Sequence, residues 1–212
     1  MNRFPGFVRQ HIAALRLLLV FTVVTGIIYP VVMVAISQVA FHNQANGSPV
    51  SYHNRVVGSS LLCQEFVTAK GNPLPQYFQP RPSSAILSGA ANDYGCDPRY
   101  SAASNLGPNN SDLVTAIKQR QKQIAAFDHV TISQIPPDAL TTSASGLDPD
   151  ISPANAAIQV NRVAAARHVS PSAITALVKQ YTQGRTLGFL GEPAVNVLDL
   201  NVALDQKYPF HG

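Results

Sequence analysis

The longest run of apolar residues lies near the N-terminus. Residues 17–36 carry no charged side chain. An α-helix of that length rises roughly 30 Å, which is the thickness of the hydrocarbon core of a bilayer. Residues 12–15 can extend the helix, with the stem of Arg16 reaching back to the interface. The pattern predicts one transmembrane helix over residues 17–36, preceded by an arm over residues 1–16.

A cleaved signal peptide is the alternative interpretation of this run. Ala35-Ile36-Ser37 supplies small residues of the kind found at a cleavage site. The apolar core of a signal peptide is usually about 7 to 15 residues long, and this run is longer. Its length therefore favours an anchor that stays attached.

The predicted helix has one face that a simple anchor does not need. Gly and Thr allow helices to approach closely and can hydrogen-bond across the contact. Pro30 is expected to kink the helix or to weaken its ladder of hydrogen bonds. We interpret the face as packing against a larger membrane partner; the alternative is that these residue types are tolerated in the span. The face comprises Thr22, Thr25, Gly26, Tyr29 and Met33.

The rest of the chain, residues 37–212, is expected to form one globular domain. Residues 42–55 are polar and turn-rich, and residues 55–62 alternate weakly, as a strand does. Residues 71–110 are rich in Gly, Pro, Ser and Asn and have no clear period. A loop of that length inside a compact domain is uncommon and often functional.

The second half of the chain predicts three helices. The first starts after Ser111 or Asp112, where an apolar stripe begins. The other two start with serine as the cap and proline in the first turn, and the last ends near Gly184 as a C-cap. The predicted helices cover residues 112–127, 153–168 and 171–184.

An apolar, β-branched tail closes the chain. Residues 194–200 predict a strand, and residues 202–206 predict a short helical turn. The fold class is therefore α+β, with few strands and with the helices clustered late in the sequence.

The helix predicted over residues 153–168 carries two stripes. Asn155, Gln159 and Arg162 form a polar stripe. This stripe is either an ordinary solvated face or a contact surface for a ligand or a partner subunit. The apolar stripe beside it comprises Ala156, Val160, Val163 and the stem of Arg167.

Charge is distributed in a way that predicts topology. The chain has a net charge of +4, and Arg3, Arg9 and Arg16 all precede the apolar run. Positively charged flanks of a membrane span stay on the cytoplasmic side. The chain is therefore predicted to be a single-pass protein of the bacterial inner membrane, with its N-terminus in the cytoplasm and its domain in the periplasm. Without those three residues the chain has 12 basic and 11 acidic residues, a net of +1. This near neutrality gives no reason to propose nucleic-acid binding.

The sequence contains no constellation typical of catalysis. No histidine pairs with another ligand at metal-binding spacing, and neither a G-x-S-x-G nor a phosphate-loop motif occurs. Ser143, Ser145 and Asp148 resemble a nucleophile loop but lack a base at a defined distance. We therefore expect a non-catalytic chain with no metal of its own.

The two cysteines, Cys63 and Cys96, leave two interpretations open. In an exported domain they can form a disulfide. A domain of this size builds a core without one, which favours two unpaired, half-buried cysteines.

Ordered motifs along almost the whole chain resemble the C subunit family of the Kdp potassium pump, a potassium-transporting P-type ATPase. Each motif is weak alone, but their order and spacing are specific. The chain departs from the family pattern at Cys63, at Ala144 and at Asp150, where the family usually has Gly, Gly and His. The motifs include Thr25-Gly-Ile-Ile-Tyr-Pro30, Gln44-Ala-Asn-Gly-Ser48, Ser104-Asn-Leu-Gly-Pro108, Ser145-Gly-Leu-Asp-Pro149, Gln159-Val-Asn-Arg-Val-Ala164 and Gly184-Arg-Thr-Leu-Gly-Phe-Leu-Gly-Glu-Pro193.

The resemblance implies a non-catalytic subunit of a high-affinity, ATP-driven potassium importer. Its implied partners are an ATP-hydrolysing P-type subunit and a channel-like subunit that binds potassium. The resemblance also implies a catalytic chaperone that raises ATP affinity, with Gln159 and Arg162 at the nucleotide. The predicted topology conflicts with direct contact, because ATP is inside the cell. Two other classes stay open: a membrane-anchored envelope hydrolase and a single-span assembly factor for an exported partner.

Overall fold

The computed structural model describes residues 5–86 and 95–210. Arg3 and His211 lie outside this part of the chain. The chain divides into two compact units, residues 1–48 and residues 49–212, and each is described by itself.

The first unit is one long helix followed by a short one. Its residues 6–40 are long and apolar enough to cross a membrane, and they contain the predicted span. The long helix is continuous through α1 (Gly6–Val23), the π-helical η1 (Val24–Ile28) and α2 (Tyr29–Ala40), and α3 (His42–Ala45) follows.

Pro30 explains where the π-helical turn lies. Proline has no N–H to donate to the carbonyl of Gly26, and its ring crowds that carbonyl. The hydrogen-bond ladder widens to the π-helical pattern over Val24–Ile28, which ends two residues before the proline. The disturbance expected at Pro30 is thus a local change of hydrogen-bond register.

The second unit opens with a two-stranded antiparallel sheet of β1 (Pro49–Tyr52) and β2 (Arg55–Ser59). Pro49 lies opposite Ser59, and Tyr52 lies opposite Arg55. The two turn residues between the strands have left-handed φ values of 49° and 61°, as tight hairpins require. The predicted strand over residues 55–62 is therefore present but ends at Ser59.

A three-stranded sheet lies further along the chain. Its order is β3 (Asp150–Ile151), β5 (Ala194–Asn196) and β4 (Thr182–Gln183), with both pairings antiparallel. Around it are α4 (Ser111–Asp128), η2 (Ile132–Gln134), α5 (Pro137–Leu140), α6 (Pro153–Ala166), α7 (Pro171–Gln180) and α8 (Val197–Lys207).

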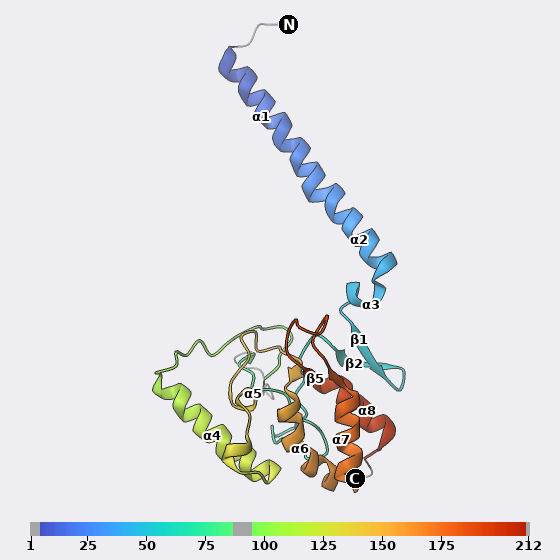
Figure 1. The fold of residues 1–212 in the computed structure, drawn as a ribbon. Helices are drawn as coiled ribbons and strands as arrows, with labels where there is room; N and C mark the ends of the chain where they lie inside the picture. Colours follow the sequence, from blue (N-terminus) through green and yellow to red (C-terminus); the bar gives the residue numbers. More distant parts are fainter. Residues whose placement is uncertain (1–4, 87–94, 211–212) are drawn as a thin grey trace. The chain divides into compact units, whose positions relative to one another are not determined.

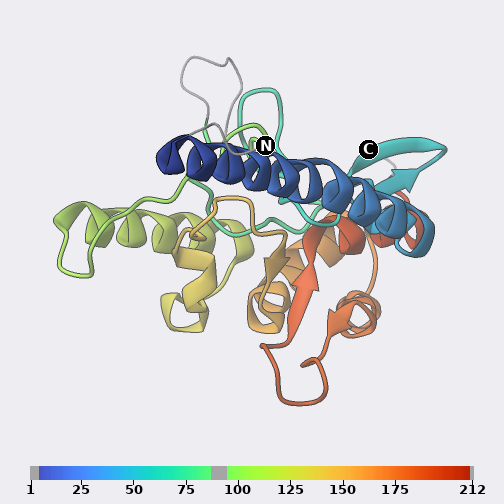
Figure 2. The ribbon, with the colours of Figure 1, turned by 90° about the horizontal axis from the view of Figure 1, so that it is seen from above.

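The main core lies where α6, α7 and α8 meet β5 (Figure 1). The predicted apolar stripe of α6 is confirmed, because Ala156, Val160 and Val163 are buried in this core. A smaller apolar cluster lies beneath α4 and α5 and includes Ile135, Ala139 and Leu140. Figure 2 shows α4 at the far end of the unit from α8.

Helix starts agree with the predicted capping. Ser152 accepts a hydrogen bond from the Asn155 amide, and Ser170 accepts one from the Ala173 amide. The first helix starts one residue earlier than expected, because Asn110 is its cap. The third helix ends at Gln180, with Tyr181 in place of Gly184 at its C-cap.

The strand predicted over residues 194–200 is wrong after Asn196. The side chain of Asn196 accepts a hydrogen bond from the Asp199 amide and starts α8 at Val197. The apolar residues that follow face the core from a helix and not from a strand. The Asn196 cap favours a helix, and here it prevails over the β-branched residues, which favour a strand.

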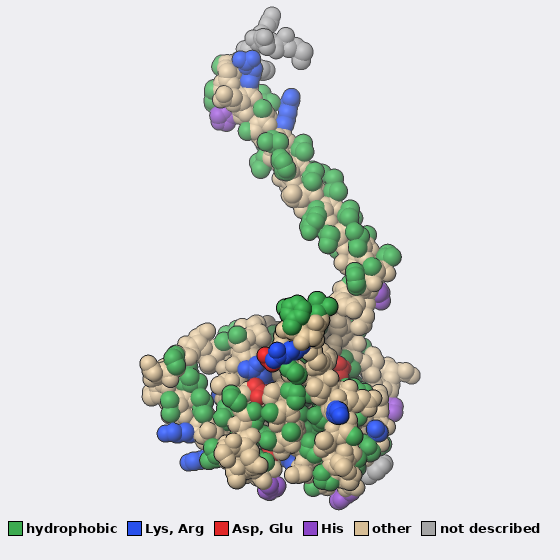
Figure 3. Space-filling model, viewed as in Figure 1, with side chains coloured by type: hydrophobic (Ala, Val, Ile, Leu, Met, Phe, Trp, Pro, Cys, Tyr) green, Lys and Arg blue, Asp and Glu red, His purple; other side chains and the backbone are tan. Residues whose placement is uncertain are grey.

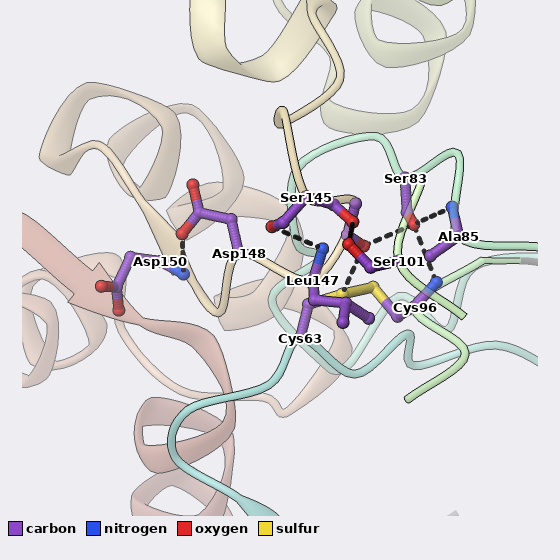
Figure 4. The surroundings of a disulfide bond; sticks show 10 residues. Cys63, Ser83, Ala85, Cys96, Ser101, Ser145, Leu147, Asp148 and Asp150 are labelled. Carbon is purple, nitrogen blue, oxygen red and sulfur yellow. Dashed lines mark hydrogen bonds between the residues drawn. A yellow bond between two sulfur atoms is a disulfide. The ribbon is translucent and has the colours of Figure 1, made fainter. Parts of the chain in front are cut away.

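The interpretation of Cys63 and Cys96 as unpaired is also wrong, because they form a disulfide (Figure 4). The pair is buried and joins two segments of the long irregular region. Ser83 adds to this junction, since its hydroxyl donates to the Gly146 carbonyl and accepts from the amides of Ala85 and Cys96. The disulfide holds together loops that have little secondary structure of their own.

Candidate functional site

Residues 75–79 pass along α6 without a neighbouring strand, with Phe78 buried and residues 76, 77 and 79 half-buried. Buried carbonyl groups need hydrogen-bond donors, and here side chains supply them. The donors come from α6, from its C-cap and from α8. Arg162 donates to the carbonyls of Pro75 and Tyr77, and Arg167 donates to the carbonyl of Gln76. Asn201 donates to the carbonyl of Phe78, and Gln159 donates to the carbonyl of Gln79. These hydrogen bonds are 2.6 to 3.2 Å long.

The amide of Gln159 has all of its hydrogen-bonding capacity in use. Its Oε1 accepts from the Gln79 amide at 2.7 Å and from Arg162 at 2.7 Å. Its Nε2 donates to the Gln79 carbonyl at 3.2 Å and to Asn155 Oδ1 at 3.0 Å. Only 3% of the residue is exposed. Gln159 therefore fixes the backbone of Gln79 much as a partner strand would.

Arg162 is held in the same interior. Its Nε lies 2.7 Å from Asp128, and its guanidinium stacks over the Phe127 ring at 4.3 Å. Burial lowers the pKa of Arg162 and raises that of Asp128, and the attraction between the two charges opposes both changes. Removing one partner of such a pair leaves a buried charge without compensation.

Arg167, at the end of α6, makes a third set of contacts. It bonds the carbonyls of Gln76 and Tyr208 and pairs with Asp205 at 2.8 Å. The Tyr77 hydroxyl donates to the same aspartate at 3.0 Å. Burial and the charge of Asp205 raise the pKa of Tyr77. This cluster joins residues 76–77 and the C-terminal residues 205–208 to the end of α6.

A cavity of about 590 Å³ adjoins the network between α4, α6 and the irregular loops. Arg120 lines it, donates to the Leu140 carbonyl and has no carboxylate partner within the described ranges. Burial lowers the pKa of Arg120. Gln159 and Asn155 also reach the wall, but their amides are already engaged with each other, with Gln79 and with Asp138. At Gln159 the wall therefore offers an incoming ligand no free donor or acceptor.

Comparison with known proteins gives the family of the chain. A family model described as "K+-transporting ATPase, c chain" matches residues 11–206. The chain belongs to this family.

Relatives within the c-chain family match along nearly the whole length. A protein of Kineococcus radiotolerans named "Potassium-transporting ATPase KdpC subunit" is 48% identical over 96% of this chain and 97% of its own. A protein with the same name from Mycobacterium tuberculosis is 44% identical over 93% and 98%. Another, from Methylococcus capsulatus, is 46% identical over 91% and 95%.

In this c chain the structure brings Gln159 and Arg162 into direct contact, and both are buried. The interpretation of the polar stripe as a solvated face is wrong, because segment 75–79 and Asp128 cover it. Its third member, Asn155, is 3% exposed. Polar residues at helical spacing predict a shared face correctly, but the sequence does not show what covers that face.

The suggested nucleophile loop of the c chain is a structural turn (Figure 4). The Ser145 hydroxyl accepts from the Leu147 amide, and Asp148 pairs with Arg81 at 2.8 Å. Ser143 is buried. No group of three or more His, Cys, Asp or Glu suited to a metal occurs in residues 5–86 and 95–210.

The predicted span face lies wholly within the first unit. Two of its hydroxyls bond the helix itself: Thr22 donates to the Leu18 carbonyl at 2.8 Å and Thr25 to the Phe21 carbonyl at 2.6 Å. Gly26 has open space around the position of a Cβ atom, and all five face residues are exposed.

Sequence reasoning missed several members of the buried network, among them Asn201, Asp128 and Gln79. Asn201 sits in an apolar helix and is 1% exposed, Asp128 ends α4, and Gln79 lies in the irregular region. A lone Asn among apolar positions, as in Val197–Leu204, was the available signal, because a buried amide requires partners.

Proposed function

We propose that the chain is the non-catalytic, single-span subunit of an ATP-driven potassium import complex. The observation that carries this proposal is the family match, which includes both the span and the globular unit. The implied partners are the ATP-hydrolysing P-type subunit and the channel-like subunit that binds potassium. Potassium is then the ion that the complex transports, and this subunit needs no cofactor of its own.

The proposed orientation places residues 1–16 in the cytoplasm and residues 37–212 in the periplasm. Arg9 and Arg16 precede the apolar run, and positive charge is retained inside. The disulfide between Cys63 and Cys96 is a second, independent support. Disulfides persist in oxidising compartments such as the periplasm and are rare in the cytosol.

The face of Thr22, Thr25, Gly26, Tyr29 and Met33 is the proposed intramembrane contact with a partner subunit. Gly26 supports it because, in the part of the chain that the structure describes, no neighbouring group lies within 4 Å of the position of its missing Cβ. Small residues at such positions allow two helices to approach closely.

The implied effect on ATP affinity is proposed to be indirect. A nucleotide at Gln159 would have to displace four hydrogen bonds within the protein, two of them to the Gln79 backbone. The proposed topology also separates this residue from cytoplasmic ATP. Any influence on ATP hydrolysis then passes through the membrane as a coupling between states of the complex.

One experiment tests subunit function and nucleotide contact together. The full chain is co-expressed with the two partner subunits, purified in mild detergent and treated with a photoreactive ATP analogue. We expect co-purification, potassium-stimulated ATPase activity only with all subunits present, and labelling confined to the ATP-hydrolysing subunit. Failure to co-purify would reject the subunit function, and labelling near Gln159 would reject the indirect route.

The orientation has its own test. An enzyme reporter that works only in the periplasm is fused after Gly212, and a reporter that works only in the cytoplasm serves as the control. We expect activity from the periplasmic reporter alone. The reverse pattern would reject the orientation without affecting family membership.

A further inference from the structure

The loop between β4 and β5 exposes apolar side chains that the globular unit does not cover. Leu187 is 79% exposed, Phe189 68% and Leu190 49%. We call these three residues the apolar tip. Figure 2 shows the loop projecting beyond the rest of the unit, and Figure 3 shows hydrophobic side chains gathered at that edge, beside oppositely charged groups. Exposed apolar groups gathered in one place mark a contact surface.

The loop has its shape before any contact is made. Thr186 and Leu190 exchange two backbone hydrogen bonds of 2.9 Å each. The amide of Gly188 donates to the Arg185 carbonyl, and that of Phe189 donates to Thr186. Two of the three amides of the tip, those of Phe189 and Leu190, thus donate within the loop, which lowers the cost of burying this backbone in lipid.

The apolar tip has no charged side chain, and the two charged side chains at the base of the loop form an ion pair. Arg185 and Glu192 pair across the loop at 2.7 Å, and they are the charged residues of segment 184–193. A protein interface of ordinary composition would use side-chain hydrogen bonds at its rim. Between the paired charges only Thr186 carries a polar side chain. This composition matches a lipid interface better than a protein surface.

The base of the loop lies next to the point where the chain enters the globular unit. Asn196 of β5 donates to the Ser60 carbonyl at 2.8 Å. The neighbouring Ser59 is the strand partner of Pro49, the first residue of the unit. In the sequence Pro49 follows the span helix by nine residues, which reach at most about 32 Å when fully extended. The tip thus belongs to the same end of the globular unit as Pro49, where the chain enters it.

We propose that the apolar tip inserts into the interfacial region of the lipid bilayer and gives the globular unit a second membrane contact beside its span. This inference rests on the proposed function in one respect, namely that the first unit is a membrane anchor. Apolar and aromatic side chains at a bilayer interface bury area without needing specific partners. The tip would hold the orientation of the unit on the membrane, which one span alone does not fix.

The chain has no tryptophan, so one introduced tryptophan reports on a single position. The full-length Phe189→Trp protein is reconstituted in phosphatidylethanolamine–phosphatidylglycerol vesicles, with and without lipids brominated on their acyl chains. The matched control is Ile132→Trp, at a position that is 51% exposed on η2. Leu187→Trp provides a second probe of the tip. Vesicle flotation reports separately whether the chain is anchored.

We expect a blue shift of emission and quenching by brominated lipid for both tip variants, and neither for the control. Emission and aqueous iodide quenching equal to those of the control would overturn the proposal. Shielding of the tryptophan from iodide that arises only after the partner subunits are added would also overturn it, because the tip would then contact a protein and not lipid. Loss of flotation would instead reject the membrane anchor, so the two failures are distinguishable.

Discussion

The side chain of Gln159 supplies to residue 79 what a neighbouring strand would supply in a sheet. Together with Arg162, Arg167 and Asn201 it satisfies every carbonyl of segment 75–79. Such a segment can be irregular and buried because its polar groups are paired. The same bonds make each of these four side chains difficult to replace.

Gln159→Ala is expected to lower the free energy of unfolding by about 2–3 kcal/mol, because it leaves the Gln79 amide and carbonyl buried and unpaired. The measurement is urea denaturation of the full chain in detergent. Gln119→Ala, at an exposed position of α4, is the control and should change little. Equal effects of the two substitutions would contradict the assigned role.

Asp150→Asn is expected to stabilise the protein at neutral pH. Burial raises the pKa of Asp150 above its ordinary value of 3.8, and the charge of Asp148 raises it further. The folded state therefore binds this proton more tightly than the unfolded chain, so stability falls as the pH rises through the folded pKa. Asparagine removes that loss. Thermal melts should coincide below pH 3.8 and separate toward pH 7 in favour of the variant; a constant difference would refute the electrostatic cause.

Among elements, the helices with strong start signals were predictable and the final strand was not. Ser152 and Ser170 mark α6 and α7 because their side chains and the following prolines act locally. Residues 194–200 were misread because a β-branched run fits a buried strand or a buried helix equally well, and only Asn196 distinguishes them. The sequence grouped Gln159 with Arg162 but gave no sign of segment 75–79, because that contact joins residues about 80 positions apart.

The span helix allows a test that leaves the globular unit untouched. No other part of residues 5–86 and 95–210 lies within 4 Å of a Cβ placed at Gly26, so Gly26→Leu should let the isolated subunit insert and fold normally. Packing against the partner should weaken by about 1–2 kcal/mol, since close approach is lost. Co-purification and growth at limiting potassium are the measurements.

Ala35→Leu provides the matched control for the span. It adds a leucine to the same helix, about 180° around the axis from the Gly26 face at 3.6 residues per turn. The control should assemble normally. If both variants behave like the parent protein, the face is not an interface.

At the scale of the whole molecule, one covalent link connects the irregular region to itself. The disulfide closes a loop with a sequence separation of 33 and anchors the segments near Ser83 and Gly146. The sequence alone left this pairing open, because a domain of this size has enough apolar residues for a core without it. The disulfide is expected to matter most for the loops it joins, which contribute few residues to the main core.

Replacing both cysteines, Cys63→Ser with Cys96→Ser, is expected to lower stability by roughly 3–4 kcal/mol from the restored freedom of the unfolded chain. Thermal melting of the full chain measures the loss. Reductant should shift the melt of the parent protein toward that of the variant and leave the variant unchanged. A parent protein insensitive to reductant under unfolding conditions would contradict the disulfide.

Asn201 and Phe78 carry a consequence for the order in which the molecule is made. The side chain of Asn201 bonds both the amide and the carbonyl of Phe78 at 2.9 Å, across 123 residues of sequence. In the proposed orientation the N-terminus stays in the cytoplasm and the globular unit crosses the membrane as it is synthesised. The backbone of Phe78 therefore lacks this hydrogen-bond partner until α8 has been translated. We expect a product truncated before Val197 to leave that segment open to proteases, so that the last helix distinguishes complete copies of the protein from truncated ones.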